Sequence, residues 1–162
     1  PDLLKNYNII HQTGRANFTE TKKTMDAILF SHPHKSRYVP KEYLSDLDMR
    51  TAVGASSVII SRAGSTIFEI AHWGKPSIII PISKEISHDQ TSNALAYARK
   101  GACVVIEEYN LTSHLFISEL TRIMSNPQIL QNMSASARAF SRDDSADVIA
   151  RVILETVLSH EK

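Results

Sequence analysis

The first residues with chemical potential follow the apolar run at 58–60. Gly64 allows a sharp turn there, and Ser65 and Thr66 are favourable residues for starting a helix. The backbone amides of such a turn can hold a phosphate. Glu69 lies one helical turn after Ser65, where a carboxylate can accept hydrogen bonds from two adjacent sugar hydroxyls. A structural alternative stays open, because Thr66 and Glu69 also have the spacing of a capping box, in which the glutamate only closes the helix end.

A second polar group lies further along the chain, at 88–93. It contains His88, Asp89, Gln90 and Asn93. Acid and amide side chains next to each other can donate to and accept from neighbouring hydroxyls of a sugar. Taken alone, Asp89 is better explained as an acid in the first turn of a helix, where the helix dipole favours it. Its place after a buried strand favours a binding role.

A third group, His11 and Gln12, lies where the first expected strand ends. A histidine and a glutamine at such a position either bind a ligand or form hydrogen bonds within their own loop. Arg62 and Lys75 face either a phosphate or solvent. His32 and His34 are too few for a metal site.

Alternating apolar runs and amphipathic segments predict the elements that carry these groups. We expect strands at 7–11, 37–39, 58–60, 77–80 and 103–106, and helices at 20–30, 47–54, 91–100, 113–125, 127–140 and 145–158. This order predicts an α/β fold, a Rossmann-like doubly wound parallel sheet with a helical C-terminal tail. Strands 58–60 and 77–80 are expected to be buried on both faces. The three polar groups then fall at the carboxyl edge of the sheet, where open α/β sheets bind ligands.

Composition excludes several classes of protein. A net charge of +1 gives no reason to expect nucleic-acid binding. Cys103 is the only cysteine and lies in an apolar run, so we expect a buried thiol. Neither a G-x-G-x-x-G pattern nor a P-loop occurs, which argues against dinucleotide enzymes and NTPases. With no signal peptide and no apolar span of membrane length, we expect a cytoplasmic protein or one at the membrane surface.

The three groups, taken in order, resemble the C-terminal half of MurG-type glycosyltransferases, the family 28 branch of the GT-B fold. The matching segments are 11–14, 61–70, 74–76, 89–94, 101–102 and 111–112. The resemblance covers essentially the whole chain. It implies one UDP-sugar-binding domain over residues 1–162.

The resemblance implies that this domain binds the donor, UDP-N-acetylglucosamine. Glu69 would bind the uridine ribose, and the turn at 64–66 would bind the phosphate and sugar. Asp89 and Gln90 would hold sugar hydroxyls, and the backbone of Leu44 would meet the uracil. The family passes N-acetylglucosamine to a lipid-linked peptidoglycan intermediate with inversion and requires no metal or other cofactor. It thereby implies peripheral membrane association of the full enzyme, at the cytoplasmic face.

Two departures from the family pattern qualify this expectation. The turn at Gly64 is one residue shorter than usual. The first strand, the glycine-rich diphosphate loop and the N-terminal half with the acceptor site and general base are not in the sequence. We therefore expect a fragment or one subunit of a two-part enzyme, inactive alone. The alternatives are another GT-B transferase, a split-subunit N-acetylglucosamine transferase, a UDP-sugar epimerase, or a non-catalytic nucleotide-sugar-binding module.

The last expected helix has more apolar residues than one narrow stripe can hold. They are Val148, Ile149, Val152, Ile153, Val157 and Leu158. One interpretation is an exposed apolar face that belongs to a missing partner. The other is that all six pack locally on this domain.

Overall fold

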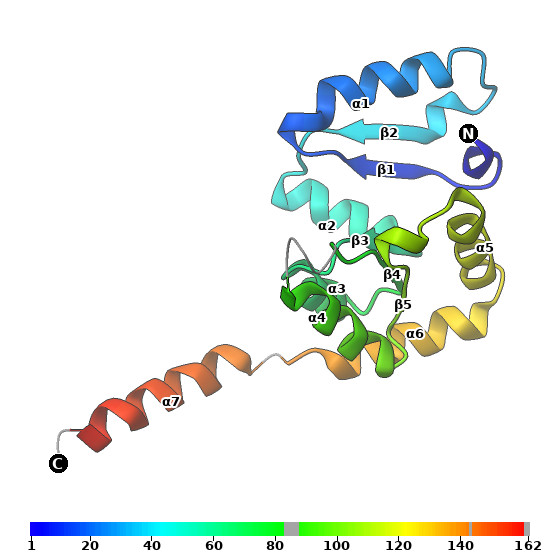
Figure 1. The fold of residues 1–162 in the computed structure, drawn as a ribbon. Helices are drawn as coiled ribbons and strands as arrows, with labels where there is room; N and C mark the ends of the chain where they lie inside the picture. Colours follow the sequence, from blue (N-terminus) through cyan, green and yellow to red (C-terminus); the bar gives the residue numbers. More distant parts are fainter. Residues whose placement is uncertain (83–87, 143, 161–162) are drawn as a thin grey trace. The chain divides into compact units, whose positions relative to one another are not determined.

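The computed structural model describes residues 1–82, 88–142 and 144–160, without the side chains at 88, 89, 159 and 160. The chain consists of two compact units, Pro1–Ser56 and Ser57–Lys162, and each is described by itself (Figure 1). Strands pair in parallel in both units, and a helix connects each pair. The predicted parallel α/β fold with a helical tail is confirmed.

The first unit is built around a single β-α-β crossover. Its elements are η1 (Asp2–Lys5), β1 (Ile9–Gln12), α1 (Arg15–Ile28), η2 (Lys35–Arg37), β2 (Tyr38–Lys41) and α2 (Asp46–Ala55). Helix α1 begins five residues earlier than expected, because Gly14 at φ 75° turns the chain directly after Gln12 and Thr13. Gln12 consequently belongs to β1 and not to the loop beyond it.

The second unit has a three-stranded parallel sheet in the order β3-β4-β5. Its elements are β3 (Ile59–Ser61), α3 (Thr66–Trp73), β4 (Ser77–Ile79), α4 (His88–Arg99), β5 (Cys103–Val105), η3 (Glu108–Asn110), α5 (Ser113–Met124), α6 (Pro127–Phe140) and α7 (Ser145–His160). The connections from β3 to β4 and from β4 to β5 both move the chain to the next strand in the same direction across the sheet. Right-handed crossovers therefore place α3 and α4 on one face of the sheet.

The middle strand β4 and its neighbour β3 differ in how far their side chains are buried. All three residues of β4 are buried, as expected for a strand covered on both faces. The same expectation for β3 was wrong, because Ile60 is 46% exposed. Strand β3 is one of the two outer strands of this sheet and pairs only with β4, so its side chains have neighbouring strand residues on one side only.

The core of the second unit lies between the sheet and helices α3, α4 and α6. It contains Ala63, Ile67, Ile70, Ala71, Ile79, Ala94, Tyr97, Ala102, Cys103 and Ala137. Burial raises the pKa of the Cys103 thiol to about 12. The expectation of a buried cysteine is confirmed.

Local capping residues define where these helices begin and end. The side chains of Thr112 and Asn126 accept hydrogen bonds from the first turns of α5 and α6, and both helices begin where the sequence predicts. Gly74 ends α3 in the left-handed conformation, at φ 63°. The Ser134 hydroxyl of α6 donates to the Gly74 carbonyl over 2.6 Å, which attaches the end of α3 to α6.

Replacing Gly74 with alanine should destabilise the protein by about 1–2 kcal/mol, the cost of a left-handed non-glycine residue. A Cβ at this position would also press on the Arg138 side chain, which has to move. Gly64→Ala is the matched control, since its backbone has no positive φ and a Cβ there meets open space. Urea denaturation measures both variants. Equal free energies of unfolding in the two would contradict this account of Gly74.

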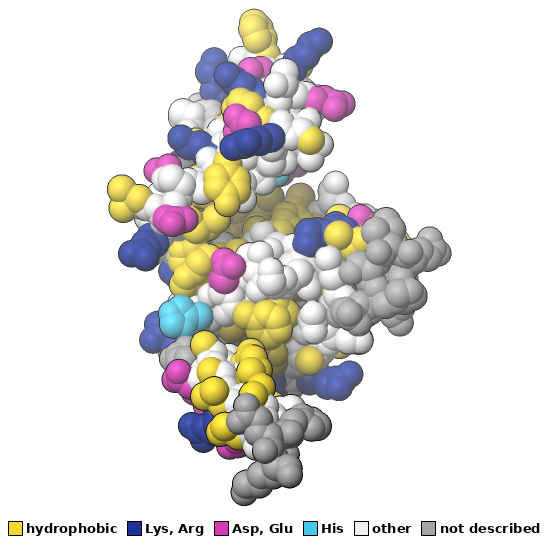
Figure 2. Space-filling view, turned by 90° about the vertical axis from the view of Figure 1, so that its left-hand side faces the viewer, with side chains coloured by type: hydrophobic (Ala, Val, Ile, Leu, Met, Phe, Trp, Pro, Cys, Tyr) yellow, Lys and Arg dark blue, Asp and Glu magenta, His cyan; other side chains and the backbone are white. Residues whose placement is uncertain are grey.

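Helix α7 carries a broad apolar surface. The six apolar side chains named for this helix are all 40% to 60% exposed, and hydrophobic side chains cover much of its visible face (Figure 2). The interpretation of an exposed apolar face is therefore correct, and local burial of all six is excluded. In the described residues no helix is both long and apolar enough to cross a membrane.

The double variant Val152→Glu and Val157→Glu should bind less of a hydrophobic dye than the unchanged protein, because it interrupts this apolar face. Arg151→Glu on the same helix changes the net charge by the same two units and keeps the apolar residues. Dye fluorescence and sedimentation velocity compare the three proteins. Equal dye binding by the double variant and the unchanged protein would contradict an accessible apolar face.

Candidate functional site

The carboxyl ends of the three strands of the second unit lie level with one another. Beyond the strands, the Ile80 amide donates to the Ser61 carbonyl over 2.9 Å, and the Ile106 amide donates to the Ile79 carbonyl over 3.0 Å. Arg62 therefore follows β3 at the same edge at which the residues after β4 and β5 emerge. This is the edge at which the sequence predicts ligand binding.

An ion pair spans this edge. Arg62 Nη2 lies 3.1 Å from Glu108 Oε1, and both side chains are a little under half exposed. Arg62 follows β3, whereas Glu108 comes three residues after the end of β5. The pair therefore connects the two outer strands across the end of the middle one.

The start of α3 offers open backbone donors. The Ile67 amide donates to the Gly64 carbonyl and the Phe68 amide to the Ser65 carbonyl. Within the described residues the amides of Ser65 and Thr66 have no acceptor, as expected for a helix N-terminus. The partial positive charge of this terminus favours an anion.

Glu69 lies in the first turn of α3 with an exposed side chain. The capping box is not formed, because Ser65 is the N-cap residue and makes no side-chain capping bond. No hydrogen bond or ion pair to Glu69 is present among the described residues. Its carboxylate is therefore available to a ligand.

Of the second polar group, the structure describes two side chains. Gln90 Oε1 accepts a hydrogen bond from the Ile82 amide over 3.2 Å, which ties the start of α4 to the residues after β4. Asn93 is half-buried in the next turn of α4. The side chains of His88 and Asp89 lie outside the described residues, although their backbone belongs to α4.

In the first unit the structure brings two predicted residues together. The Leu44 amide donates to Gln12 Oε1 over 2.9 Å. His11 Nδ1 lies 2.8 Å from the Tyr38 hydroxyl, whose pKa is raised by burial. Gln12 thus fixes the backbone at Leu44, and His11 is held by the neighbouring strand.

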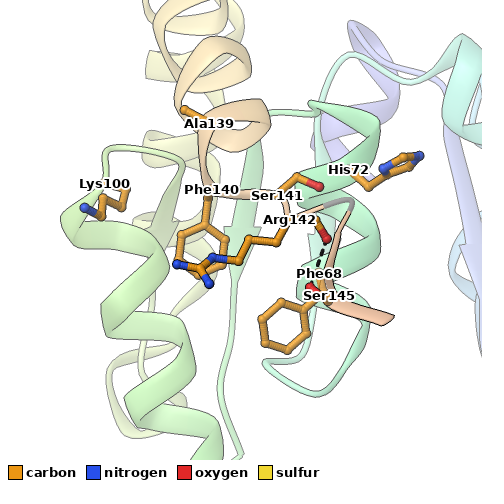
Figure 3. A pocket seen from close by; sticks show the side chains of 8 residues that line it. All are labelled: Phe68, His72, Lys100, Ala139, Phe140, Ser141, Arg142 and Ser145. Carbon is orange, nitrogen blue, oxygen red and sulfur yellow. Dashed lines mark hydrogen bonds between the residues drawn. The ribbon is translucent and has the colours of Figure 1, made fainter. Parts of the chain in front are cut away.

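A separate hollow of about 920 Å³ lies in the second unit between α3, the end of α4 and the junction of α6 with α7 (Figure 3). It is lined by Phe68, His72, Lys100, Ala139, Phe140, Ser141, Arg142 and Ser145. None of the predicted binding residues is among them. The rings of Phe68 and Phe140 stack at 6.3 Å, so an aromatic contact between α3 and α6 forms part of this surface.

Sequence reasoning missed Glu108. The signal was present, because Glu107 and Glu108 follow an expected buried strand just as Arg62 does. Among the described residues, no group of three histidine, cysteine, aspartate or glutamate side chains could hold a metal ion.

Comparison with known proteins identifies the family. Residues 2–149 match the model of the glycosyltransferase family 28 C-terminal domain. The UDP-N-acetylglucosamine--N-acetylmuramyl-(pentapeptide) pyrophosphoryl-undecaprenol N-acetylglucosamine transferase of Clostridium tetani is 32% identical over 153 residues, which is 93% of this chain and 40% of that protein. The transferase of the same name from Clostridium kluyveri is 36% identical over 139 residues, 84% of this chain and 36% of that protein.

A solved structure shares the fold. The crystal structure of Acinetobacter baumannii MurG superposes with a TM-score of 0.73 at 24% identity, over 91% of this chain and 41% of that one. The chain spans about two fifths of the length of the relatives it matches. The resemblance predicted from the sequence is confirmed, and the chain belongs to the glycosyltransferase family 28 C-terminal domain family.

Proposed function

We propose that this chain binds the nucleotide-sugar donor of a glycosyltransferase and that the donor is UDP-N-acetylglucosamine. Family membership supports the class of reaction. The names of the relatives from Clostridium tetani and Clostridium kluyveri support the identity of the transferred sugar, N-acetylglucosamine. The proposal extends to this chain what those names state of the relatives.

The observation that carries the proposal is the open start of α3 beside an unengaged carboxylate. The amides of Ser65 and Thr66 point to no acceptor in the described residues, and Glu69 has no partner there. An anion suits the amides, and a pair of hydroxyl donors suits the carboxylate. We propose that the turn at 64–66 binds the phosphate and that Glu69 binds the ribose hydroxyls.

The remaining predicted residues receive separate roles. We propose that Asp89, Gln90 and Asn93 contact hydroxyls of the transferred sugar. Since the Leu44 amide already donates to Gln12, the Leu44 carbonyl is the group that would accept from the uracil N3–H. Gln12 then positions the base-binding backbone, and His11 stays a candidate contact of the same strand end.

The chemistry fits a role in stabilising the leaving group. In an inverting transfer, negative charge grows on the departing UDP while a base removes the proton of the acceptor hydroxyl. We propose that Arg62 and the amides at the start of α3 stabilise that charge. We propose that the base and the binding site for a lipid-linked acceptor lie in an N-terminal half of the full enzyme, at the cytoplasmic face of the membrane.

Replacing Glu69 with glutamine should weaken UDP binding by about 1.5 kcal/mol, roughly tenfold, the lower end of the range for a charge-assisted hydrogen bond. The low end applies because Glu69 is exposed before binding. Isothermal titration calorimetry of the 162-residue chain with UDP measures the change. UDP-N-acetylglucosamine and GDP, titrated in parallel, test the specificity for the sugar and for the base.

Glu119→Gln is the control for this measurement. Glu119 is an acid on α5 that pairs with Arg122 over 2.7 Å and is not one of the predicted binding residues. Its replacement should leave UDP affinity unchanged. If the Glu69 variant folds normally and binds UDP as tightly as the unchanged chain, the role proposed for Glu69 is wrong.

A further inference from the structure

We infer that Glu108 competes with the phosphates of the bound nucleotide for the guanidinium of Arg62, and so lowers the affinity of the site for a phosphorylated ligand. The inference rests on the proposed function, because it concerns the same strand edge. It assigns a role to a side chain that lies outside the set of predicted binding residues.

This ion pair joins residues that follow two strands which are not neighbours in the sheet. Strands β3 and β5 each pair with β4 and not with one another. Neighbouring strands lie about 4.8 Å apart, so the ends of the two outer strands are roughly 10 Å apart. Two long side chains are needed to close that distance, and Arg62 with Glu108 does so to 3.1 Å. The ion pair thus spans the end of β4.

The pair is accessible to a competing anion. The side chains of Arg62 and Glu108 are 43% and 46% exposed, so a ligand can approach without unfolding any element. A guanidinium has five N–H donors, and its planar fork fits a phosphate as well as a carboxylate. An exposed ion pair contributes little free energy, which makes it easy to exchange.

The position of Arg62 in its loop indicates that Glu108 weakens phosphate binding. Arg62 lies two residues before Gly64 and three before Ser65, at the turn that we propose as the phosphate site. A phosphate there attracts the guanidinium and repels the Glu108 carboxylate. Glu108 therefore opposes binding twice, by occupying the cation and by its own charge.

A neighbouring acid provides a matched control. Glu107 precedes Glu108 and accepts a hydrogen bond from the Tyr109 hydroxyl, whereas in the described part of the chain the ion-pair partner of Arg62 is Glu108. This bond to Glu107 raises the pKa of Tyr109. Glu107→Gln removes the same charge from the same loop and leaves the Arg62–Glu108 pair in place.

The test is calorimetric titration of the full 162-residue chain with UDP and with uridine. Glu108→Gln should bind UDP about two- to fivefold more tightly than the unchanged chain, the range expected for one exposed ion pair. Uridine, which has no phosphate, should bind both equally. Glu107→Gln should bind UDP as the unchanged chain does, and Arg62→Gln combined with Glu108→Gln should lose the gain. Glu108→Asp, which keeps the charge but shortens the side chain, should show part of the gain.

The outcomes separate this inference from the proposed function. If the unchanged chain binds UDP and Glu108→Gln binds it no more tightly, the competition is absent and only this inference falls. The inference is also overturned if Glu107→Gln gains as much affinity for UDP as Glu108→Gln does, because the effect would then come from the total charge of the loop. It is overturned as well if Glu108→Gln gains as much affinity for uridine as for UDP, because the phosphates would then play no part. If the unchanged chain does not bind UDP, the proposed function falls and takes this inference with it.

Discussion

Parallel pairing on both sides of the buried strand β4 is the constraint on which the second unit depends. Its residues Ser77–Ile79 pair with β3 on one side and with β5 on the other, in a register that sets Ile79 beside Ser61 and Val105. Because every side chain of β4 is buried, a slip by one residue would move each of them into space that is packed around a different side chain. The level strand ends follow from this register, and so does the ion pair that crosses them.

Features that depend on neighbouring residues in the chain could be predicted from the sequence. Gly74 ends a helix, and Thr112 and Asn126 begin helices, because each acts on backbone within a few residues. The buried strand β4 could be predicted in the same way, since the run at 78–80 is apolar. The expected helix at 20–30 began too late, because the sequence pattern does not show that Gly14 turns the chain directly into the helix at Arg15.

Features that depend on distant residues could not be predicted. The exposure of Ile60 follows from its place in an outer strand, which the local apolar run does not encode. The Gln12–Leu44 bond joins residues 32 positions apart, and the Arg62–Glu108 bond joins residues 46 positions apart. In both cases the sequence shows two residues that can form a hydrogen bond. Predicting that they meet would have required knowledge of the order of the strands in the sheet.

The attachment of Gly74 to α6 has a consequence for the opposite end of α3. An eight-residue helix is only about 12 Å long, and it behaves as a short rigid rod. With its last carbonyl held by Ser134 and its inner face buried through Ile67 and Ile70, the helix has little freedom to tilt. The amides of Ser65 and Thr66 at its start are therefore held in place, and a ligand that bound there would lose little affinity to ordering of the protein. Substitutions on α6 that weaken the Ser134–Gly74 hydrogen bond would raise that entropic cost, although they lie at the opposite end of α3 from the ligand.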